Sequence, residues 1–226
     1  MLPSYALVSR QRTLVPGVLV VPGVAKALEC AERVFALCAF LILLPILAVV
    51  ALVVRLLSGY APLVAHRRVG RLGRPFWMLK FRTMWGGAHN RRGTEFVERL
   101  RGDEPVPVVK RGQDGRVTSR FARVCRRYSI DELPQLWHVV CGEMSLVGPR
   151  PMTPSEWDRY YGPSAAEVLA LKPGITGLWQ TRGRNRLTYP QRRRLDLFLS
   201  RHYCLWLYLR ILGATIPRVL AGRDAW

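Results

Sequence analysis

The pattern of apolar and charged positions is dominated by one segment near the N-terminus. No charged residue occurs from Val34 to Val54, which reads VFALCAFLILLPILAVVALVV. About 20 apolar residues suffice to cross the ~30 Å hydrocarbon core of a bilayer, so this segment predicts a membrane helix. Pro45 lies at its midpoint, where a proline removes a backbone hydrogen bond and kinks a helix. The helix therefore either spans the membrane with a tolerated proline or bends there and returns to the same face.

Basic residues flank this segment on both sides. Lys26 and Arg33 precede it, and Arg55, Arg67 and Arg68 follow it. The positive-inside rule expects one basic flank, on the cytoplasmic side. A re-entrant helix would place both flanks on that side, whereas a spanning helix would separate them. The residues by themselves leave both topologies open.

The stretch RVTSRFARVCRRYS has the period of an amphipathic helix. Its apolar residues share one face and its arginines form a neighbouring stripe. The apolar set is Val117, Phe121, Val124 and Tyr128, and the basic set is Arg116, Arg120, Arg123 and Arg127. The stripe is either a solvated basic face or a surface for anionic lipid headgroups.

A second amphipathic stretch, DELPQLWHVV, begins with two adjacent carboxylates, Asp131 and Glu132. Apolar residues follow the spacing i, i+3, i+4, i+7 from Leu133, and Pro134 requires the helix to start close to Asp131. Asp131 is then an N-cap and Glu132 a first-turn acid that the helix dipole favours. Alternatively, Asp131 stays ionised near the many arginines and serves as a nucleophile in phosphoryl chemistry.

Downstream loops carry basic residues among prolines and glycines. In VGPRP, Arg150 precedes a proline and so lies in extended backbone, where a guanidinium is well placed for bidentate phosphate binding. KPGITGLWQTRGRN adds Lys172, Arg182 and Arg184. No Walker or dinucleotide-binding glycine motif occurs in a strand-to-helix context, so side chains would have to hold a nucleotide. A surface Arg150 in a turn is the alternative interpretation.

The pattern before these loops is less regular. HRRVGRLGRP indicates a turn, and FWMLKFRTM after it indicates a strand or the start of a helix. Residues 86–115 contain glycines, Asn90 and two prolines, and we expect a surface loop or insertion there.

Composition narrows the class of partner. The 226 residues fit one domain, and 35 Lys+Arg against 15 Asp+Glu give a net charge of +20, which requires an anionic partner. The chain is also 50% hydrophobic, unlike a typical nucleic-acid binder of that charge. Five scattered cysteines without a CxxC motif argue against a disulfide framework or a zinc site and favour a reducing compartment. The first 20 residues lack the single apolar run of a secretory signal.

Four motifs in order then resemble one known family. KFRTM, DELPQLWHVVCGEMSLVGPRP, KPGITGLWQTRGRN and RRRLDLFLSRHYCLWLYLRIL together resemble the bacterial sugar transferases, the small monotopic phosphoglycosyl transferases, over roughly residues 27–222. The resemblance implies transfer of a sugar-1-phosphate from a UDP-sugar to a polyprenyl phosphate such as undecaprenyl phosphate, with release of UMP. Such a step begins the synthesis of a polysaccharide, such as an exopolysaccharide, or of a glycoconjugate.

The resemblance also assigns roles to residues. Asp131 would be the nucleophile that carries the phosphosugar covalently, and Glu132 would hold Mg²⁺ with it or orient the polyprenyl phosphate. The matching phosphate-binding residues are Lys80, Arg82, Arg150 and Arg184. Pro45 matches the family's helix-breaking proline, which favours the re-entrant topology.

The expected fold is therefore α+β and mostly helical, in a monotopic membrane protein. It would comprise an N-terminal extension (1–26), a re-entrant membrane helix (27–58) and a cytoplasmic catalytic domain with amphipathic surface helices (59–226). We expect it at the cytoplasmic face of the bacterial inner membrane, in contact with membrane lipids and without nucleic acid. A homodimer is compatible with this expectation.

Two departures from the family pattern stand near the membrane helix. Leu44 replaces the serine that often precedes the proline, and the basic start of the helix is reduced to Lys26 and Arg33 among acidic residues. The rival hypothesis is a membrane-attached protein that binds nucleic acid or anionic lipid without catalysis, in which Asp131 and Glu132 only cap a helix.

Overall fold

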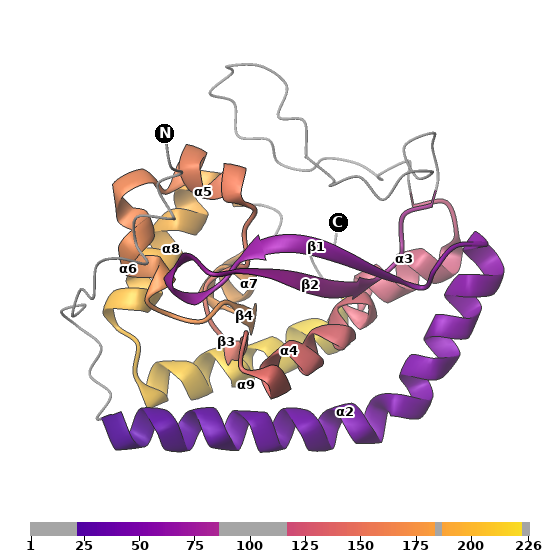
Figure 1. Cartoon of the computed structure of the whole chain (residues 1–226), viewed down its shortest axis with the longest axis horizontal. Coiled ribbons are helices and arrows are strands. Elements are labelled where there is room, and N and C mark those ends of the chain that lie inside the picture. Colours follow the sequence, from indigo (N-terminus) through magenta and orange to yellow (C-terminus); the bar gives the residue numbers. More distant parts are fainter. Residues whose placement is uncertain (1–21, 86–116, 184–186, 223–226) are drawn as a thin grey trace.

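The computed structural model describes residues 22–85, 117–183 and 187–222. Helices make up most of this part of the chain (Figure 1). They are α2 (Pro22–Ser58), α3 (Arg120–Arg127), α4 (Leu136–Cys141), α5 (Pro154–Tyr160), α6 (Ala165–Leu169), α7 (Leu178–Arg182), α8 (Tyr189–Arg201) and α9 (Leu205–Ala221), with 3-10 helices η1 (Arg71–Gly73), η3 (Ile130–Gln135) and η4 (Gly162–Ser164). The strands are β1 (Leu63–Val69), β2 (Pro75–Phe81), β3 (Ser145–Val147) and β4 (Gly174–Thr176). The predicted mostly helical architecture is confirmed.

The apolar segment lies inside α2, which is continuous through Pro45. Within the described residues, α2 is the helix that is long and apolar enough to cross a membrane, judged by length and composition. Figure 1 shows that α2 bends sharply and that the rest of the described chain lies in the angle between its two limbs. Re-entry of this helix into the membrane stays a prediction.

Much of α2 presents apolar side chains to the outside. Its large apolar residues that are more than half exposed are Val34, Phe35, Leu41, Ile42, Ile46, Val49, Leu52, Leu56 and Leu57. An apolar surface of this extent marks contact with a membrane or another protein, because water solvates it poorly. The exposed face agrees with the predicted membrane helix.

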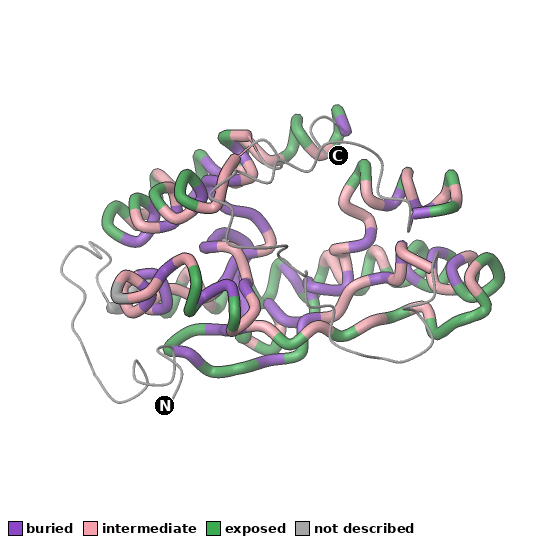
Figure 2. Tube along the Cα trace, turned by 90° about the horizontal axis from the view of Figure 1, so that it is seen from above, coloured by how far each residue is buried: buried purple, intermediate pink, exposed green. Residues whose placement is uncertain are grey.

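The inner side of α2 packs on the remaining elements in two places. Ala36, in the first half, belongs to a buried cluster with Val139 of α4 and Ile211 of α9. Val54, near the end, belongs to a second cluster with Phe81 of β2. Figure 2 shows the buried positions gathered in the middle of the molecule, with exposed positions along the outer sides of the helices. Both halves of α2 are thus fixed to the same body.

β1 and β2 form an antiparallel hairpin that carries the KFRTM motif. The register pairs Leu63 with Phe81 and Val64 with Lys80, so FWMLKF forms a strand rather than a helix start. The predicted turn lies between the strands, where the backbone nitrogen of Gly70 donates to the carbonyl of Arg74 at 2.7 Å. This hairpin places Lys80 next to η3, against which β2 packs.

β3 and β4 form a short parallel pair that brings the two Gly- and Pro-rich motifs together. A Cβ atom on Gly174 would lie 2.0 Å from the backbone nitrogen of Gly148, so only glycine permits this approach. The segment that contains Arg150 follows β3, and α7 follows β4.

The predicted apolar face is confirmed in its first half, where Val117 is buried and Phe121 packs against the cluster of Phe81 and Val54, and is wrong in its second half. Val124 and Tyr128 are exposed, whereas the buried residues of α3 are Ala122 and Cys125. Small side chains let α3 approach η3 closely, so the buried side is defined by size and not by hydrophobicity alone. Ser119 caps this helix by accepting from the backbone nitrogen of Ala122 at 3.0 Å. Arg116 and residues 86–115 lie outside the described part of the chain.

Candidate active site

The adjacent carboxylates Asp131 and Glu132 lie within the 3-10 helix η3, between α3 and α4. Ser129 begins this helix in the left-handed region with a φ of 56° and makes no side-chain cap. The N-cap interpretation of Asp131 is therefore wrong, because the chain turns sharply at Ser129 and Asp131 already lies inside the helix. Pro134 is tolerated because η3 is short and its first turn needs few backbone donors. The turn buries Asp131, which is 8% exposed.

Lys80 lies directly beside these carboxylates. Its Nζ donates to Oε1 of Glu132 at 2.7 Å, and both side chains are partly buried. A charge-assisted hydrogen bond at this distance is short and strong. The structure thus brings together three residues that the sequence motifs predict, from β2 and from η3.

Burial governs the electrostatics of Asp131. It raises the pKa of the carboxyl to about 6, the charge of Glu132 adds to the rise, and Lys80 and Arg126 oppose it. The Asp131 carboxyl thus keeps its proton to a higher pH than a solvated aspartate does. The direction of the shift is the opposite of the arginine-driven one assumed from the sequence, because desolvation exceeds the attraction of the cations.

Arg82 directly follows β2, and its backbone nitrogen donates to the carbonyl of Pro62 at 2.8 Å. Its Nε donates to the carbonyl of Ala61 at 2.9 Å, and its guanidinium lies 5.6 Å from the ring centre of Tyr60. Arg82 therefore contacts the turn between α2 and β1. A role in phosphate binding stays a prediction.

Arg150 lies among the elements that follow β4. Its guanidinium is 5.1 Å from the ring centre of Trp179 in α7, and that of Arg192 in α8 is 5.2 Å from the same ring. Cations over an indole are attracted by the ring quadrupole. Arg184, the fourth predicted phosphate-binding residue, lies outside the described residues.

The sequence did not predict a second buried carboxylate, Asp196 in α8. It is fully buried, and Oδ2 accepts from the hydroxyl of Tyr161 at 2.6 Å. Burial raises its pKa to about 7, against the hydrogen bond from Tyr161 and the charges of Arg150 and Arg192. The available signal was a single acid in the arginine-rich stretch RRRLDLFLSR.

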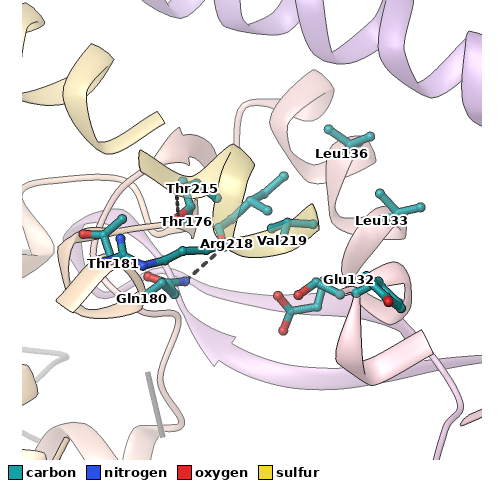
Figure 3. A pocket seen from close by; sticks show the side chains of 12 residues that line it. Glu132, Leu133, Leu136, Thr176, Gln180, Thr181, Thr215, Arg218 and Val219 are labelled. Atoms are coloured by element: carbon teal, nitrogen blue, oxygen red, sulfur yellow. Dashed lines mark hydrogen bonds between the residues drawn. The ribbon is translucent and has the colours of Figure 1, made fainter. Parts of the chain in front are cut away.

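A pocket of about 160 Å³ lies beside Glu132 (Figure 3). Its walls come from η3, α4, β4, α7 and α9, together with the turn before η3. The lining residues are Tyr128, Ser129, Glu132, Leu133, Leu136, Ile175, Thr176, Gln180, Thr181, Thr215, Arg218 and Val219. Gln180 and Thr181 directly follow Trp179 in α7, so the same short helix borders the pocket and contacts Arg150.

Asp131 and Glu132 are the residues that could hold a cation here. The described residues contain no group of three or more His, Cys, Asp or Glu side chains placed for a metal. Mg²⁺ does not require such a group, because it commonly uses one or two carboxylates with water and substrate phosphates. Two neighbouring carboxylates are oxygen donors of the kind that this ion prefers, so the site fits Mg²⁺ bound together with a phosphorylated substrate.

Comparisons with known proteins extend this picture. A UDP-galactose-lipid carrier transferase of Erwinia amylovora is 43% identical over 201 residues, which are 86% of this chain and 40% of that protein. The exopolysaccharide production protein ExoY of Sinorhizobium fredii is 36% identical over 196 residues, 86% of each chain. A UDP-glucose:undecaprenyl-phosphate glucose-1-phosphate transferase of Xanthomonas campestris is 34% identical over 211 residues, 90% of this chain and 40% of that protein. The chain thus spans 40% of the length of the first and third relatives and most of the second.

The family profile of the bacterial sugar transferases matches residues 25–222, which include all four motifs and both carboxylates of η3. The predicted resemblance is confirmed, and it places the chain among the transferases. The chain belongs to the bacterial sugar transferase family.

Proposed function

We propose that this protein transfers a sugar-1-phosphate from a UDP-sugar to a polyprenyl phosphate, undecaprenyl phosphate in a bacterium, and releases UMP. The observation that carries the proposal is the buried Asp131 beside the Glu132–Lys80 ion pair, at the edge of a pocket in a chain of this family. Two of the relatives above bear names that describe transfer to a lipid carrier or to undecaprenyl phosphate.

In the proposed mechanism, the carboxylate of Asp131 attacks the phosphorus that bears the sugar. The bond from this phosphorus to the bridging oxygen breaks, and UMP leaves with the electron pair. A phosphate oxygen of the polyprenyl phosphate then attacks the same phosphorus and releases Asp131 as a carboxylate. Burial raises the pKa of Asp131, and the partial desolvation of the buried carboxylate favours attack by its ionised form.

Cationic groups would supply the remaining chemistry. Lys80 holds Glu132 in place at 2.7 Å and offers positive charge where phosphate charge develops in the transition state. Mg²⁺ bound by Asp131 and Glu132 would neutralise the diphosphate and make UMP a better leaving group. Arg82, Arg150 and Arg184 would contact phosphate oxygens.

The membrane arrangement forms part of the proposal. We infer that α2 enters the cytoplasmic face of the inner membrane, turns at Pro45 and returns to that face. The exposed apolar side chains of α2 and its sharp bend (Figure 1) support this topology. Proline is one of the few local features that produce a sharp kink in a helix. The catalytic body would then rest at the headgroups, where the lipid phosphate lies.

A reconstituted assay tests the function. Purified protein in detergent is supplied with Mg²⁺, undecaprenyl phosphate and a panel of UDP-sugars. With one preferred UDP-sugar, release of more than one UMP per enzyme should require the lipid phosphate, whereas the sugar nucleotide alone should release at most one. Asp131→Asn should lower that release by at least a thousandfold and leave the fold unchanged. Wild-type protein that binds anionic lipid but releases no UMP would favour the rival, non-catalytic function. An Asp131→Asn variant with substantial activity would remove the covalent role of Asp131.

A further inference from the structure

The pocket beside Glu132 is mainly apolar. Leu133 and Leu136 form one wall, and Val219 of α9 and Ile175 of β4 form others. An apolar cavity of about 150 Å³ is known to hold a six-carbon ring. The volume of about 160 Å³ found here is therefore sufficient for one five-carbon isoprene unit.

The threonine hydroxyls of the lining are engaged with the protein itself, whereas Gln180 donates through Nε2 to the carbonyl of Ile175 at 3.1 Å and keeps its buried Oε1 as one open acceptor. The hydroxyls of Thr176 and Thr215 lie 2.8 Å apart as a hydrogen-bonded pair. When Thr176 is the donor of this pair, the hydroxyl of Thr215 donates to the carbonyl of Ile211 at 2.8 Å. The hydroxyl of Thr181 donates to the carbonyl of Leu178 at 2.9 Å. A sugar or a uracil ring needs hydrogen-bond partners that these hydroxyls are not free to give. A hydrocarbon chain needs no hydrogen-bond partner.

Charge identifies what the hydrocarbon carries. Arg218 is the cation in the lining of this pocket, and Figure 3 shows it reaching from α9 toward Thr181, while the Glu132 carboxylate points into the same space from η3. Arg218 thus supplies positive charge to a pocket that Glu132 also borders. A ligand with an apolar body and an anionic end matches this arrangement.

The position of α9 favours a ligand that comes from the membrane. This helix presents exposed large apolar residues on its outer side: Leu205, Trp206, Leu209, Ile216 and Leu220. Its inner side supplies Thr215, Arg218 and Val219 to the pocket. One helix therefore joins an apolar outer surface to the pocket next to the catalytic site.

We propose that this pocket binds the phosphate-proximal isoprene unit of the polyprenyl phosphate and that Arg218 pairs with its phosphate. The proposal rests on the proposed function, because it takes the lipid acceptor from that function. It adds a binding site for the acceptor and separates it from the residues that hold the UDP-sugar.

The first test measures binding and does not depend on transfer. Val219→Phe fills the pocket, and Leu220→Phe adds the same ring at the next position, which is 74% exposed. Affinities for farnesyl phosphate, inorganic phosphate and farnesol are measured with the full chain in detergent. Val219→Phe should weaken farnesyl phosphate at least tenfold relative to wild type and to Leu220→Phe. Equal affinity in the two variants overturns the proposal.

A second pair of variants covers the case in which Val219→Phe fails to fold. Arg218→Gln should weaken farnesyl phosphate about tenfold but leave farnesol unchanged, and Arg218→Lys should restore part of the affinity. Arg210→Gln removes an exposed arginine from the same helix and should change neither ligand. Loss of farnesol binding equal to that of farnesyl phosphate, or no loss of either, contradicts a phosphate contact of Arg218.

Transfer kinetics then distinguish this proposal from the function on which it rests. In the UMP-release assay, Val219→Phe should lower kcat/KM for the polyprenyl phosphate at least tenfold and leave kcat/KM for the UDP-sugar within twofold of wild type. A selective loss for the UDP-sugar would assign the pocket to the nucleotide sugar and overturn the proposal. If wild type transfers no sugar, the proposed function fails, whereas the binding result still decides whether the pocket takes an isoprenyl phosphate.

Discussion

At the scale of single residues, two buried carboxylates differ in what surrounds them. Asp131 stands beside another carboxylate, next to Lys80 and the pocket, where an incoming phosphate can replace lost solvation. Asp196 is sealed in the protein and holds the hydroxyl of Tyr161. The first carboxylate is therefore available for chemistry. The second is placed to fix α8 against α5 and to set the charge around Arg150.

Asp196 leads to a prediction about stability and pH. In the unfolded chain its carboxyl has a pKa near 3.8, and in the fold burial raises it to about 7, against Tyr161, Arg150 and Arg192. Between pH 4 and 7 the folded state binds a proton that the unfolded state has lost, so this group's contribution to stability is full below pH 4 and is lost as the pH rises through 7. The contribution is on the order of a few kcal/mol. Asp196→Asn removes it.

The measurement is the apparent melting temperature of the protein in detergent from pH 4 to 8. The fall between pH 4 and 7 should be shallower in Asp196→Asn than in wild type. Asp158→Asn, which changes an exposed carboxyl on α5, should reproduce the wild-type profile. Parallel profiles for wild type and Asp196→Asn would show that Asp196 keeps the same charge in the folded and unfolded states over this range.

Sequence motifs located the carboxylate pair and Lys80 because these residues lie within short, ordered blocks. They could not predict the hydrogen bond between Tyr161 and Asp196 or the place of Arg218 in the pocket lining, because both bring together elements that are far apart in the chain. Ser129 is another such case: its φ of 56° results from the packing of α3 against η3, and serine does not signal a left-handed backbone. The N-cap interpretation of Asp131 failed for that reason.

At the scale of elements, α2 is held by a buried acid as well as by apolar packing. Oε1 of Glu32 accepts from the hydroxyl of Ser145 at 2.6 Å, from the backbone nitrogen of Leu146 at 3.0 Å and from the hydroxyl of Tyr208 at 2.7 Å. One side chain of α2 thus joins β3 and α9. The sequence showed Glu32 only as an acid that diluted the basic flank of the helix.

Removal of this acceptor should loosen α2 from the catalytic body. Glu32→Ala leaves two buried donors, the backbone nitrogen of Leu146 and the hydroxyl of Tyr208, without their partner, because Ser145 can still donate to the carbonyl of Val147. At about 1–3 kcal/mol for each group left unsatisfied, the variant should lower the free energy of unfolding by about 2–5 kcal/mol. Glu32→Gln keeps an acceptor oxygen in place and should cost less. The readouts are the melting temperature and protease access to the segment that joins α2 to β1.

Glu29 provides the matched control, three residues earlier on the same helix. It is 42% exposed and pairs with Lys172 at 3.0 Å and with Arg71 at 3.5 Å. Exposed ion pairs contribute about 0–1 kcal/mol, so Glu29→Ala should change stability little. Equal losses in Glu29→Ala and Glu32→Ala would show that the buried hydrogen bonds do not hold the helix.

At this scale, sequence-based prediction succeeded where the length or punctuation of a segment decides the element. It failed where the size of the side chains decides which face of a helix is buried. The length of the apolar run gave α2, and the proline and glycine punctuation gave the hairpin turn. α3 buries Ala122 and Cys125, since small residues permit close approach to η3. Hydrophobic periodicity ranks larger side chains first, so besides Val117 and Phe121 it selected Val124 and Tyr128, which are exposed.

At the scale of the whole molecule, both ends of α2 contact the same body. Near its start, Glu29 pairs with Lys172. Near its end, Val54 packs with Phe81, and Arg82 binds the carbonyl of Ala61 just beyond the helix. A straight helix of 37 residues would be about 55 Å long, and it would carry its ends to opposite sides of a bilayer. The bend in Figure 1 instead leaves all other described elements between the limbs.

This arrangement predicts that the two ends of α2 face the same compartment. In a chain whose five cysteines are replaced, single cysteines at Lys26 and Ala61, both exposed, should resist a membrane-impermeant thiol reagent in intact cells and react once the cells are opened. Pro45→Leu restores a backbone donor and removes the kink, so a fraction of its molecules should adopt a spanning helix and become labelled at position 26 in intact cells, with a matching loss of UMP release. Leu44→Ala, a change at the neighbouring position, should keep the wild-type labelling. Labelling at one end of α2 only, in the chain that retains Pro45, would establish a spanning helix, because a re-entrant helix cannot expose one flank without the other.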